Sequence, residues 1–313
     1  MKIVFMGTPD FSVGALEALV AAGHEVTAVV TQPDKAKGRS GQMQFPPVKE
    51  CALKYNIPVF QPVRVKAPEV VEQLRKYEAD IFVVAAFGQI VSKEILTMPR
   101  LGCVNIHASL LPKYRGASPI NWCIINGEKE TGVTIMQMDE GVDTGDILTT
   151  VTVPIADDET AESLFEKLSK AGAELIVDTL PKLERGEITP IRQNDAESSH
   201  TKMMSKSLGE IDWNRSAVEI ERLVRGLNSW PSAYTYINGK SVKLWRCAVA
   251  DKEFDGTKQA GEIVRVTKDT VEVACKKGIL RICELQLEGK KRMDIKSFLL
   301  GNQWKEGMRL GLK

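Results

Sequence analysis

Two polar side chains end an apolar stretch in the sequence "VNIHASLLPKYRG". Asn105 and His107 occupy alternate positions there, and alternate residues of a strand point to the same face of its sheet. We therefore expect an amide and an imidazole side by side at a strand end, just before a Leu-Leu-Pro turn. Such a pair can donate hydrogen bonds to an oxyanion. On this stretch alone, a strand end with a hydrogen-bonded histidine is the simpler alternative.

An acidic loop, "DEGVDTGD", follows the next predicted strand and offers a carboxylate. Asp143 is the preferred candidate because it lies in a glycine-bounded loop that can return to the same edge of the sheet. Asp139, Glu140 and Asp146 remain competitors, and a solvated acidic turn explains any one of the four taken singly. An amide, an imidazole and a carboxylate together suit acyl or formyl transfer, because they can stabilise a tetrahedral oxyanion and move protons.

Several other chemistries lack their residues in this sequence. No Ser or Cys has a nucleophile-elbow setting, which favours direct transfer over an acyl-enzyme. Gly7-Thr8-Pro9 follows the first strand, but neither the dinucleotide nor the phosphate-loop fingerprint is present. The six cysteines form no C-x-x-C pair and only three histidines occur, so we expect no metal site and reduced thiols in a cytoplasmic protein. No apolar run reaches the length of a membrane span.

The elements that position these residues alternate along the first half of the chain. Short apolar runs predict buried strands at 3–6, 26–30, 58–60, 81–86 and 103–106, with helical patterns between them, such as 70–76. This pattern predicts an α/β fold with a Rossmann-like, mostly parallel sheet covered on both faces. Ligands of such sheets bind beyond the carboxyl ends of the strands. Gly7 and the segment Phe87–Ile90 should therefore lie at the same edge as Asn105.

The 313 residues suggest two domains. Strands at 133–138 and 149–153 flank the acidic loop, and 161–183 forms one long helix or two. A polar, weakly patterned stretch precedes a helix at 217–227 and short strands at 233–237, 242–245, 261–266, 270–275 and 278–287. These strands predict a smaller β-barrel of the oligonucleotide-binding type. The predicted limits are 1–189 for the catalytic domain, 190–207 for a linker and 208–313 for the barrel.

Charge is uneven along the chain. The net charge is +1, yet residues 206–313 carry 21 Lys and Arg against 14 Asp and Glu, whereas the remainder carries 21 against 27. A basic C-terminal third indicates a polyanionic partner, most often nucleic acid, although a solvated basic face explains the charge equally well. The polar insertion Thr31–Pro47, with Lys35, Lys37 and Arg39, is expected to be a mobile surface loop without regular structure.

Asn105-x-His107, the stretch Ser109–Pro112 and the downstream Asp143 together resemble the signature of enzymes that use 10-formyltetrahydrofolate. Further stretches resemble the methionyl-tRNA formyltransferase family in particular: "FMGTPDFSV", "TQPD", "GVTIMQMDEGVDTGD" and "LNSWPSAYT". The resemblance covers both predicted domains and nearly the whole chain.

The resemblance implies transfer of the formyl group of 10-formyltetrahydrofolate to the free amino group of methionyl initiator tRNA, for translation initiation. The transfer would be direct, through a tetrahedral intermediate. It implies Asn105, His107 and Asp143 as the catalytic residues, and no metal. The folate site would be lined by Ser109, Leu110, Leu111, Pro112, Phe87, Gly88, Gln89, Ile90 and Asp139.

The resemblance also implies that the insertion enters the acceptor arm of the tRNA, with Lys35, Lys37 and Arg39 as candidate contacts. In the barrel, the turn "EGKKR" offers Lys290, Lys291 and Arg292, because phosphate contacts supply much of the affinity for nucleic acid. Two alternatives stay open. One is a formyltransferase for a small amine, such as a sugar nucleotide or glycinamide ribonucleotide. The other is an RNA-binding protein without catalysis.

Overall fold

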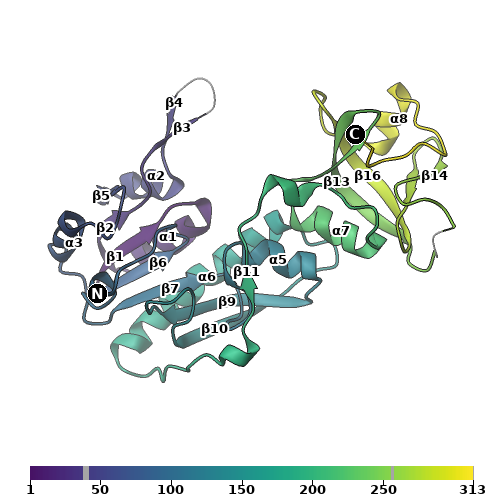
Figure 1. The fold of residues 1–313 in the computed structure, drawn as a ribbon. Coiled ribbons are helices and arrows are strands. Elements are labelled where there is room, and N and C mark those ends of the chain that lie inside the picture. Colours follow the sequence, from purple (N-terminus) through teal and green to yellow (C-terminus); the bar gives the residue numbers. More distant parts are fainter. Residues whose placement is uncertain (38–41, 255–256, 313) are drawn as a thin grey trace. The chain divides into compact units, whose positions relative to one another are not determined.

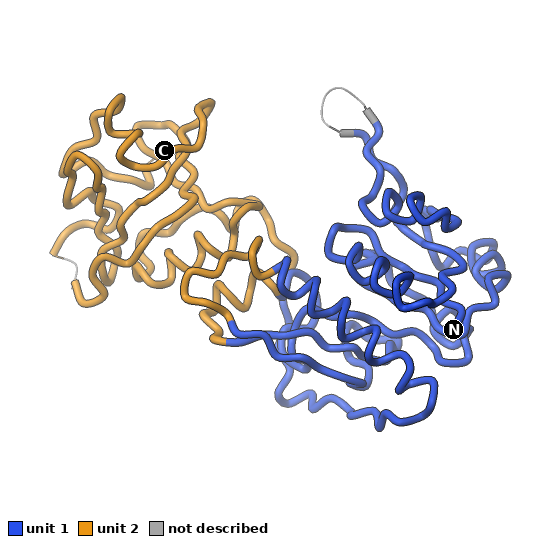
Figure 2. The backbone as a smooth tube through the Cα atoms, turned by 180° about the vertical axis from the view of Figure 1, so that it is seen from behind, with its two compact units in different colours: residues 1–119, 130–154, 165–201 blue, residues 120–129, 155–164, 202–313 orange. Residues whose placement is uncertain are grey.

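A computed structural model describes residues 1–37, 42–254 and 257–312 of the chain (Figure 1). The chain forms two compact units (Figure 2). Unit 1 contains residues 1–119, 130–154 and 165–201, and unit 2 contains residues 120–129, 155–164 and 202–313. The domain limits at 189 and 208 stay a prediction, because the two compact units interleave along the chain.

Unit 1 is built on a seven-stranded sheet with the strand order β10-β9-β7-β6-β1-β2-β5. The strands are β1 (Lys2–Gly7), β2 (Glu25–Val30), β5 (Val59–Phe60), β6 (Ile81–Ala85), β7 (Cys103–His107), β9 (Glu130–Gln137) and β10 (Ile147–Pro154). Five neighbouring strands run parallel, and β9 runs antiparallel to both of its neighbours, β7 and the edge strand β10. The predicted mostly parallel sheet is confirmed.

Helices flank this sheet (Figure 1). They include α1 (Val13–Ala21), α2 (Pro47–Lys54), α3 (Pro68–Arg75), α4 (Lys93–Leu96) and α6 (Ala161–Glu184). Val4 and Met6 of β1 are fully buried and pack with Leu74 of α3, whereas the equally buried Ile3 and Phe5 point to the other face. Burial on both faces explains why β1 reads as a continuous apolar run. No helix of the described ranges is long and apolar enough to cross a membrane.

The polar insertion differs from the expected loop without regular structure. A short hairpin forms within it, in which β3 (Lys35–Lys37) pairs antiparallel with β4 (Gln42–Gln44). Its two strands, K-A-K and Q-M-Q, have three residues each, too few for an alternating pattern to indicate a strand. At its base, Asp34 accepts hydrogen bonds from Gln61 (2.8 Å) and Lys49 (2.6 Å). These two contacts, the Gln61 bond foremost, hold the pKa of Asp34 below its ordinary value.

Unit 2 contains an antiparallel sheet with the order β12-β13-β16-β15-β14, and β17 pairs with β16. The strands are β12 (Ala233–Ile237), β13 (Lys240–Asp251), β14 (Ile263–Val266), β15 (Val271–Ala274), β16 (Ile279–Leu287) and β17 (Met293–Asp294), with helices α7 (Ala217–Gly226) and α8 (Ile295–Gly301). A capping box between Ser216 and Glu219 begins α7, because each satisfies a backbone N–H of the other.

The segment 307–311 closes this sheet into the predicted barrel. The Ile263 N–H donates to the Met308 carbonyl (2.8 Å), and the Leu310 N–H donates to the Gly261 carbonyl (2.8 Å), which joins the segment to the β14 edge. The Gly311 N–H donates to the Tyr236 carbonyl of β12 (2.8 Å). The two outer strands are therefore linked through this segment.

Helix α5 (Pro119–Asn126) contributes to unit 2, although strands of unit 1 precede and follow it along the chain. Trp122 and Ile125 pack against the hydrophobic core of unit 2. The Asn121 side-chain amide donates to the Gly226 carbonyl at the end of α7 (2.8 Å). The side of α5 that carries Trp122 and Ile125 is thus covered by the core of unit 2.

Candidate active site

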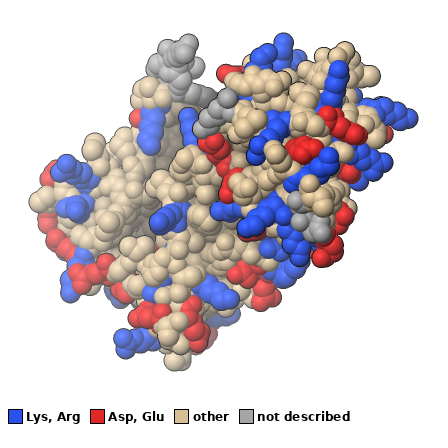
Figure 3. Space-filling view, turned by 45° about the vertical axis from the view of Figure 1, so that its right-hand side comes forward, with Lys and Arg blue, Asp and Glu red and all other residues tan. Residues whose placement is uncertain are grey.

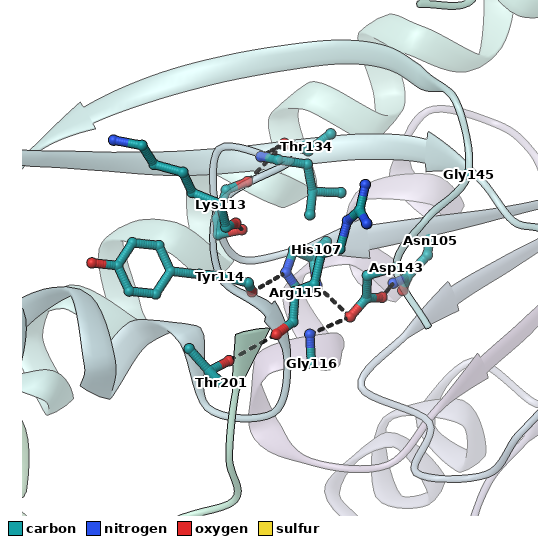
Figure 4. A network of polar contacts seen from close by, with 12 residues as sticks. Asn105, His107, Lys113, Tyr114, Arg115, Gly116, Thr134, Asp143, Gly145 and Thr201 are labelled. Carbon is teal, nitrogen blue, oxygen red and sulfur yellow. Dashed lines mark hydrogen bonds and ion pairs between the residues drawn. The ribbon is translucent and has the colours of Figure 1, made fainter. Parts of the chain in front are cut away.

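Strand β7 ends with the predicted amide and imidazole on one face (Figure 4). Asn105 is half-buried, whereas only 6% of His107 is exposed. Both residues lie opposite β9, in a register that pairs Asn105 with Met136 and His107 with Thr134. The alternation of the strand therefore places the two side chains as the sequence predicted.

Asp143 reaches both of these side chains (Figure 4). The Asn105 Nδ2 lies 3.4 Å from Asp143 Oδ1, and the His107 Nδ1 lies 3.7 Å from Asp143 Oδ2. The shortest contact to the carboxylate is the Gly116 backbone N–H, which donates to Oδ2 (2.8 Å). Since 3.4 Å and 3.7 Å exceed the usual N–H···O distance, the position of this carboxylate depends chiefly on backbone groups.

The loop that carries Asp143 begins at the amino end of β7, the end opposite to Asn105 and His107. Strand β9 runs antiparallel to β7, so the loop begins beside Cys103 at the amino end of β7, where the Met138 N–H donates to the Cys103 carbonyl (2.8 Å). It then folds back along β7 to bring Asp143 to Asn105 and His107. The loop therefore does not start at the carboxyl edge of the parallel strands, because its own strand runs in the opposite direction.

The other three carboxylates of the loop have different surroundings. Asp139 accepts hydrogen bonds from the Thr144 hydroxyl (2.7 Å) and from a backbone N–H of its own loop. Glu140 forms an exposed ion pair with a lysine of α4 (3.2 Å), and Asp146 is exposed. Asp143 is the carboxylate that contacts the amide and the imidazole.

The ring of His107 is held in a defined orientation. Its Nε2 lies 3.0 Å from the Tyr114 carbonyl oxygen. A carbonyl only accepts hydrogen bonds, so Nε2 carries a proton and donates it. The Nδ1 atom then faces Asp143. An imidazolium would donate from both nitrogens, toward Tyr114 and toward Asp143, and the geometry accommodates that form.

The predicted folate stretch Ser109–Pro112 is fastened to β9 by one buried hydroxyl. Thr134 Oγ1 donates to the Ser109 carbonyl (2.7 Å) and accepts from the Leu111 N–H (3.2 Å). Thr134 is fully buried, and Leu111 is 6% exposed. The Ser109 hydroxyl donates to the carbonyl of Lys113 (2.7 Å), which closes the turn. Leu110 is half-buried. The turn beside His107 is therefore fixed by internal bonds.

The second predicted folate segment, Phe87–Ile90, follows β6. Phe87 is buried, and its carbonyl accepts from Thr8 Oγ1 (3.1 Å) and Gln32 Nε2 (3.2 Å). The Gln89 side chain bonds to the backbone of the loop after β5, and Gly88 has a positive φ of 81°. Ile90 is 76% exposed. The folate contact of this segment stays a prediction, and Ile90 is its exposed apolar side chain.

The basic residues predicted to bind tRNA lie in both units. Lys35 is exposed on β3, and Lys37 is the last residue of that strand. Arg39 lies outside the described residues. Lys290 and Lys291 are exposed in unit 2.

Arg292 differs from the two lysines that precede it because it already has partners. Its guanidinium carbon lies 4.7 Å from the centre of the Trp245 ring, and its Nη2 forms an ion pair with Glu284. In Figure 3, the Lys and Arg side chains of this unit stand among Asp and Glu. Lys290 and Lys291 are therefore the better candidates for a phosphate contact.

The sequence analysis missed a group of residues in the segment predicted as a linker. The strand β11 (His200–Thr201) pairs in parallel with β8 (Arg115–Gly116) in unit 1. Gln193, 7% exposed, hydrogen-bonds to the loop of Asp143. Arg115 was visible beside the Leu-Leu-Pro turn, but no pattern in the sequence marked Gln193.

The cysteines of the described chain are unsuited to nucleophilic catalysis. All six are free, and five are buried. Burial raises the pKa of Cys103 and of Cys275 to about 12, and that of Cys51 to about 11. These thiols stay protonated near neutral pH, so they lack the reactive thiolate. No group of three or more His, Cys, Asp or Glu that could hold a metal ion occurs among the described residues.

Comparison with known proteins assigns the chain to a family. Residues 1–180 match the formyl transferase family, and residues 203–303 match the formyl transferase C-terminal domain. The chain belongs to the formyl transferase family.

Particular relatives are methionyl-tRNA formyltransferases. The one from Agathobacter rectalis is 58% identical and matches 98% of each chain. The one from Lachnospira eligens is 55% identical and matches 99% of this chain and all of that one. The solved structure of WlaRD, a sugar 3N-formyl transferase in the presence of dTDP and 5-N-formyl-THF, has a TM-score of 0.66 at 22% identity and covers 93% of this chain and 99% of its own. This last likeness concerns the fold.

Proposed function

We propose that this protein transfers the formyl group of 10-formyltetrahydrofolate to the amino group of methionyl initiator tRNA. The observation that carries the proposal is the convergence of Asn105, His107 and Asp143 in a chain that matches a methionyl-tRNA formyltransferase at 58% identity along its length. Because methionyl-tRNA is a substrate of translation, we place the protein in the cytoplasm.

In the proposed reaction, the methionyl amine attacks the formyl carbon. A new C–N bond forms, and the carbonyl oxygen becomes an oxyanion in a tetrahedral intermediate. The amide of Asn105 donates a hydrogen bond to this oxygen. His107 donates to it from Nδ1 when that nitrogen carries a proton, because Nε2 is bonded to the Tyr114 carbonyl and the 3.7 Å contact of Nδ1 with Asp143 is too long to engage that proton. Both bonds stabilise the transition state. The bond from the formyl carbon to N10 of the folate then breaks, and N10 takes up its electron pair and a proton. The amine loses one proton, so the transfer balances without an oxidant.

In this proposal, the carboxylate of Asp143 assists proton transfer. Its carboxylate faces His107 Nδ1 at 3.7 Å and can orient the ring, or it can accept a proton from the amine through water. No enzyme-bound formyl intermediate is needed. The raised pKa values of the buried cysteines support this direct route, since a protonated thiol is a poor nucleophile.

The folate donor is proposed to lie against Ser109–Pro112 and Phe87–Ile90, with Asp139 at the border. Two features support this placement. The first stretch adjoins His107 and is fixed to β9 by Thr134. The second stretch leaves Ile90 exposed.

The tRNA is proposed to contact unit 2 and the insertion. Residues 206–313 carry 21 Lys and Arg against 14 Asp and Glu, a balance that favours phosphate binding. Lys290, Lys291, Lys35 and Lys37 are the candidate contacts within the described residues.

The test is a formylation assay with methionyl initiator tRNA and 10-formyltetrahydrofolate. We expect formyl-methionyl-tRNA as the product, and no turnover with an amino-sugar nucleotide or glycinamide ribonucleotide as acceptor. His107→Ala should lower kcat by about a hundredfold or more, as removal of an oxyanion donor does, whereas the control His24→Ala should not. Turnover of a small amine in place of the tRNA would contradict the proposal, and so would tRNA binding without turnover.

A further inference from the structure

One buried side-chain amide bonds to the backbone of the loop that carries Asp143, on both sides of residue 144. Gln193 Nε2 donates to the backbone carbonyl of Asp143 (2.9 Å) and to that of Gly145 (2.7 Å). Each of the two amide hydrogens therefore serves one carbonyl. These bonds fix the backbone on both sides of residue 144, and Asp143 itself has a positive φ of 54°.

A second buried group fixes Gln193. The Arg115 Nε donates to Gln193 Oε1 (2.9 Å), so the amide oxygen is identified by its donor and the amide nitrogen must face the loop. Arg115 is 3% exposed, and its Nη2 also pairs with Asp195 (2.9 Å). The guanidinium thus holds the amide in the one orientation that serves both carbonyls.

The backbone next to Arg115 completes the arrangement. Gly116 donates to the Asp143 carboxylate (2.8 Å), and Tyr114 supplies the carbonyl that holds His107. The Ser199 hydroxyl accepts from the Tyr114 N–H (2.8 Å). The segment around residues 193–201 therefore holds the backbone groups that contact Asp143 and His107.

We propose that Gln193, held by Arg115, is a positioning residue that sets the carboxylate of Asp143 against Asn105 and His107. The two side-chain contacts of this carboxylate, at 3.4 Å and 3.7 Å, are too long to place it. Its place follows from the Gly116 N–H and from the loop backbone that Gln193 holds. The inference rests on the proposed function, because it assumes that Asp143 takes part in formyl transfer.

The expected effect of Gln193→Met is a lower kcat with little change in the KM of either substrate. Methionine fills a similar volume but donates no hydrogen bond, so the loop loses both tethers. A misplacement of about 1 Å in an active site can cost about a hundredfold in rate. Gln193 bonds to the backbone of residues 143 and 145, and not to Asp139 or the other predicted folate residues, so binding should be spared.

The experiment measures kcat and KM for wild type, Gln193→Met and the control Asn194→Ala with methionyl initiator tRNA. Asn194 is exposed and bonds to Glu197 in the same segment, so its change tests general loosening there. We expect a loss of about tenfold to a hundredfold for Gln193→Met and none for the control. Gln193→Glu keeps an acceptor for Arg115 but removes both tethers, and it replaces Gln193→Met if that variant does not fold.

A double variant separates positioning from a structural effect. If Gln193 acts through Asp143, adding Gln193→Met to Asp143→Asn should cost no more than about twofold further, because coupled residues are not additive. An equal fold-loss in both backgrounds would overturn the inference, as would unchanged kcat in the single variant or a change confined to KM. If the wild type itself does not formylate methionyl-tRNA, the proposed function fails instead.

Discussion

Replacement of Thr134 by valine would test how the turn beside His107 is held. The hydroxyl of Thr134 serves two backbone groups, the Ser109 carbonyl (2.7 Å) and the Leu111 N–H (3.2 Å). Valine has nearly the same shape but offers no hydrogen bond. Because residue 134 is fully buried, both groups would lose their partner without gaining water.

The magnitude follows from these two groups. A buried donor or acceptor left unsatisfied costs about 1–3 kcal/mol, so Thr134→Val should lower the free energy of unfolding by about 2–6 kcal/mol. A loss of that size is a large fraction of the stability of a typical domain, about 5–15 kcal/mol. If the turn then shifts, the KM for the folate donor should rise as well, because Ser109–Pro112 is the proposed wall of its site.

The assay is urea denaturation of wild type, Thr134→Val and the control Thr152→Val, with donor KM measured in parallel. Thr152 is exposed on β10, so its change should stay within about 0.5 kcal/mol. A loss below about 0.5 kcal/mol for Thr134→Val would show that the two backbone groups find other partners. The hydroxyl would then not be what fixes the turn.

Three further outcomes are expected. Asp143→Asn should lower kcat by about a hundredfold and Asp146→Asn should leave it unchanged, and steady-state kinetics showing the reverse ranking would refute the choice of carboxylate. The pKa of Asp34 is lowered in the folded protein. Its contribution to stability is therefore present above the unfolded pKa of about 3.9 and is lost as the pH falls through the folded pKa. In thermal melts, Asp34→Asn should destabilise the protein near neutral pH, and the difference from wild type should shrink as the pH is lowered. Replacing Lys290 and Lys291 by Ala should reduce the salt slope of tRNA binding by about 0.7 to 0.9 per lost contact, and parallel slopes with equal affinity would exclude both.

The architecture was predictable where burial leaves a pattern in the sequence. The apolar runs 3–6 and 81–86 read as strands because both faces of β1 and β6 are covered. Asn105 and His107 could be placed on one face because a strand has a strict two-residue period. The barrel strands were visible from their short alternating patterns.

The site was predictable only in part, because long-range bonds decide it. The glycine-bounded loop favoured Asp143, but its competitors stayed open because its place is fixed by Gly116 and by Gln193, which lies 50 residues away along the chain. The direction of β9 was equally hidden, because an antiparallel strand at the edge of a sheet has the same apolar content as a parallel one. Strands as short as β3 and β4, with three residues each, are too short for their periodicity to be recognised in the sequence.

The placement of α5 bears on how such a chain can be divided or recombined. A protease cut after residue 201 would break the backbone but would leave Trp122 and Ile125 packed against the core of unit 2, so the two fragments should remain associated. Separated from its partner, the N-terminal fragment would expose the apolar face of α5 and tend to aggregate. If residues 1–201 were transferred into another protein, that protein would have to supply apolar residues that pack on α5. The boundary near residue 201 therefore does not separate two independent folding units.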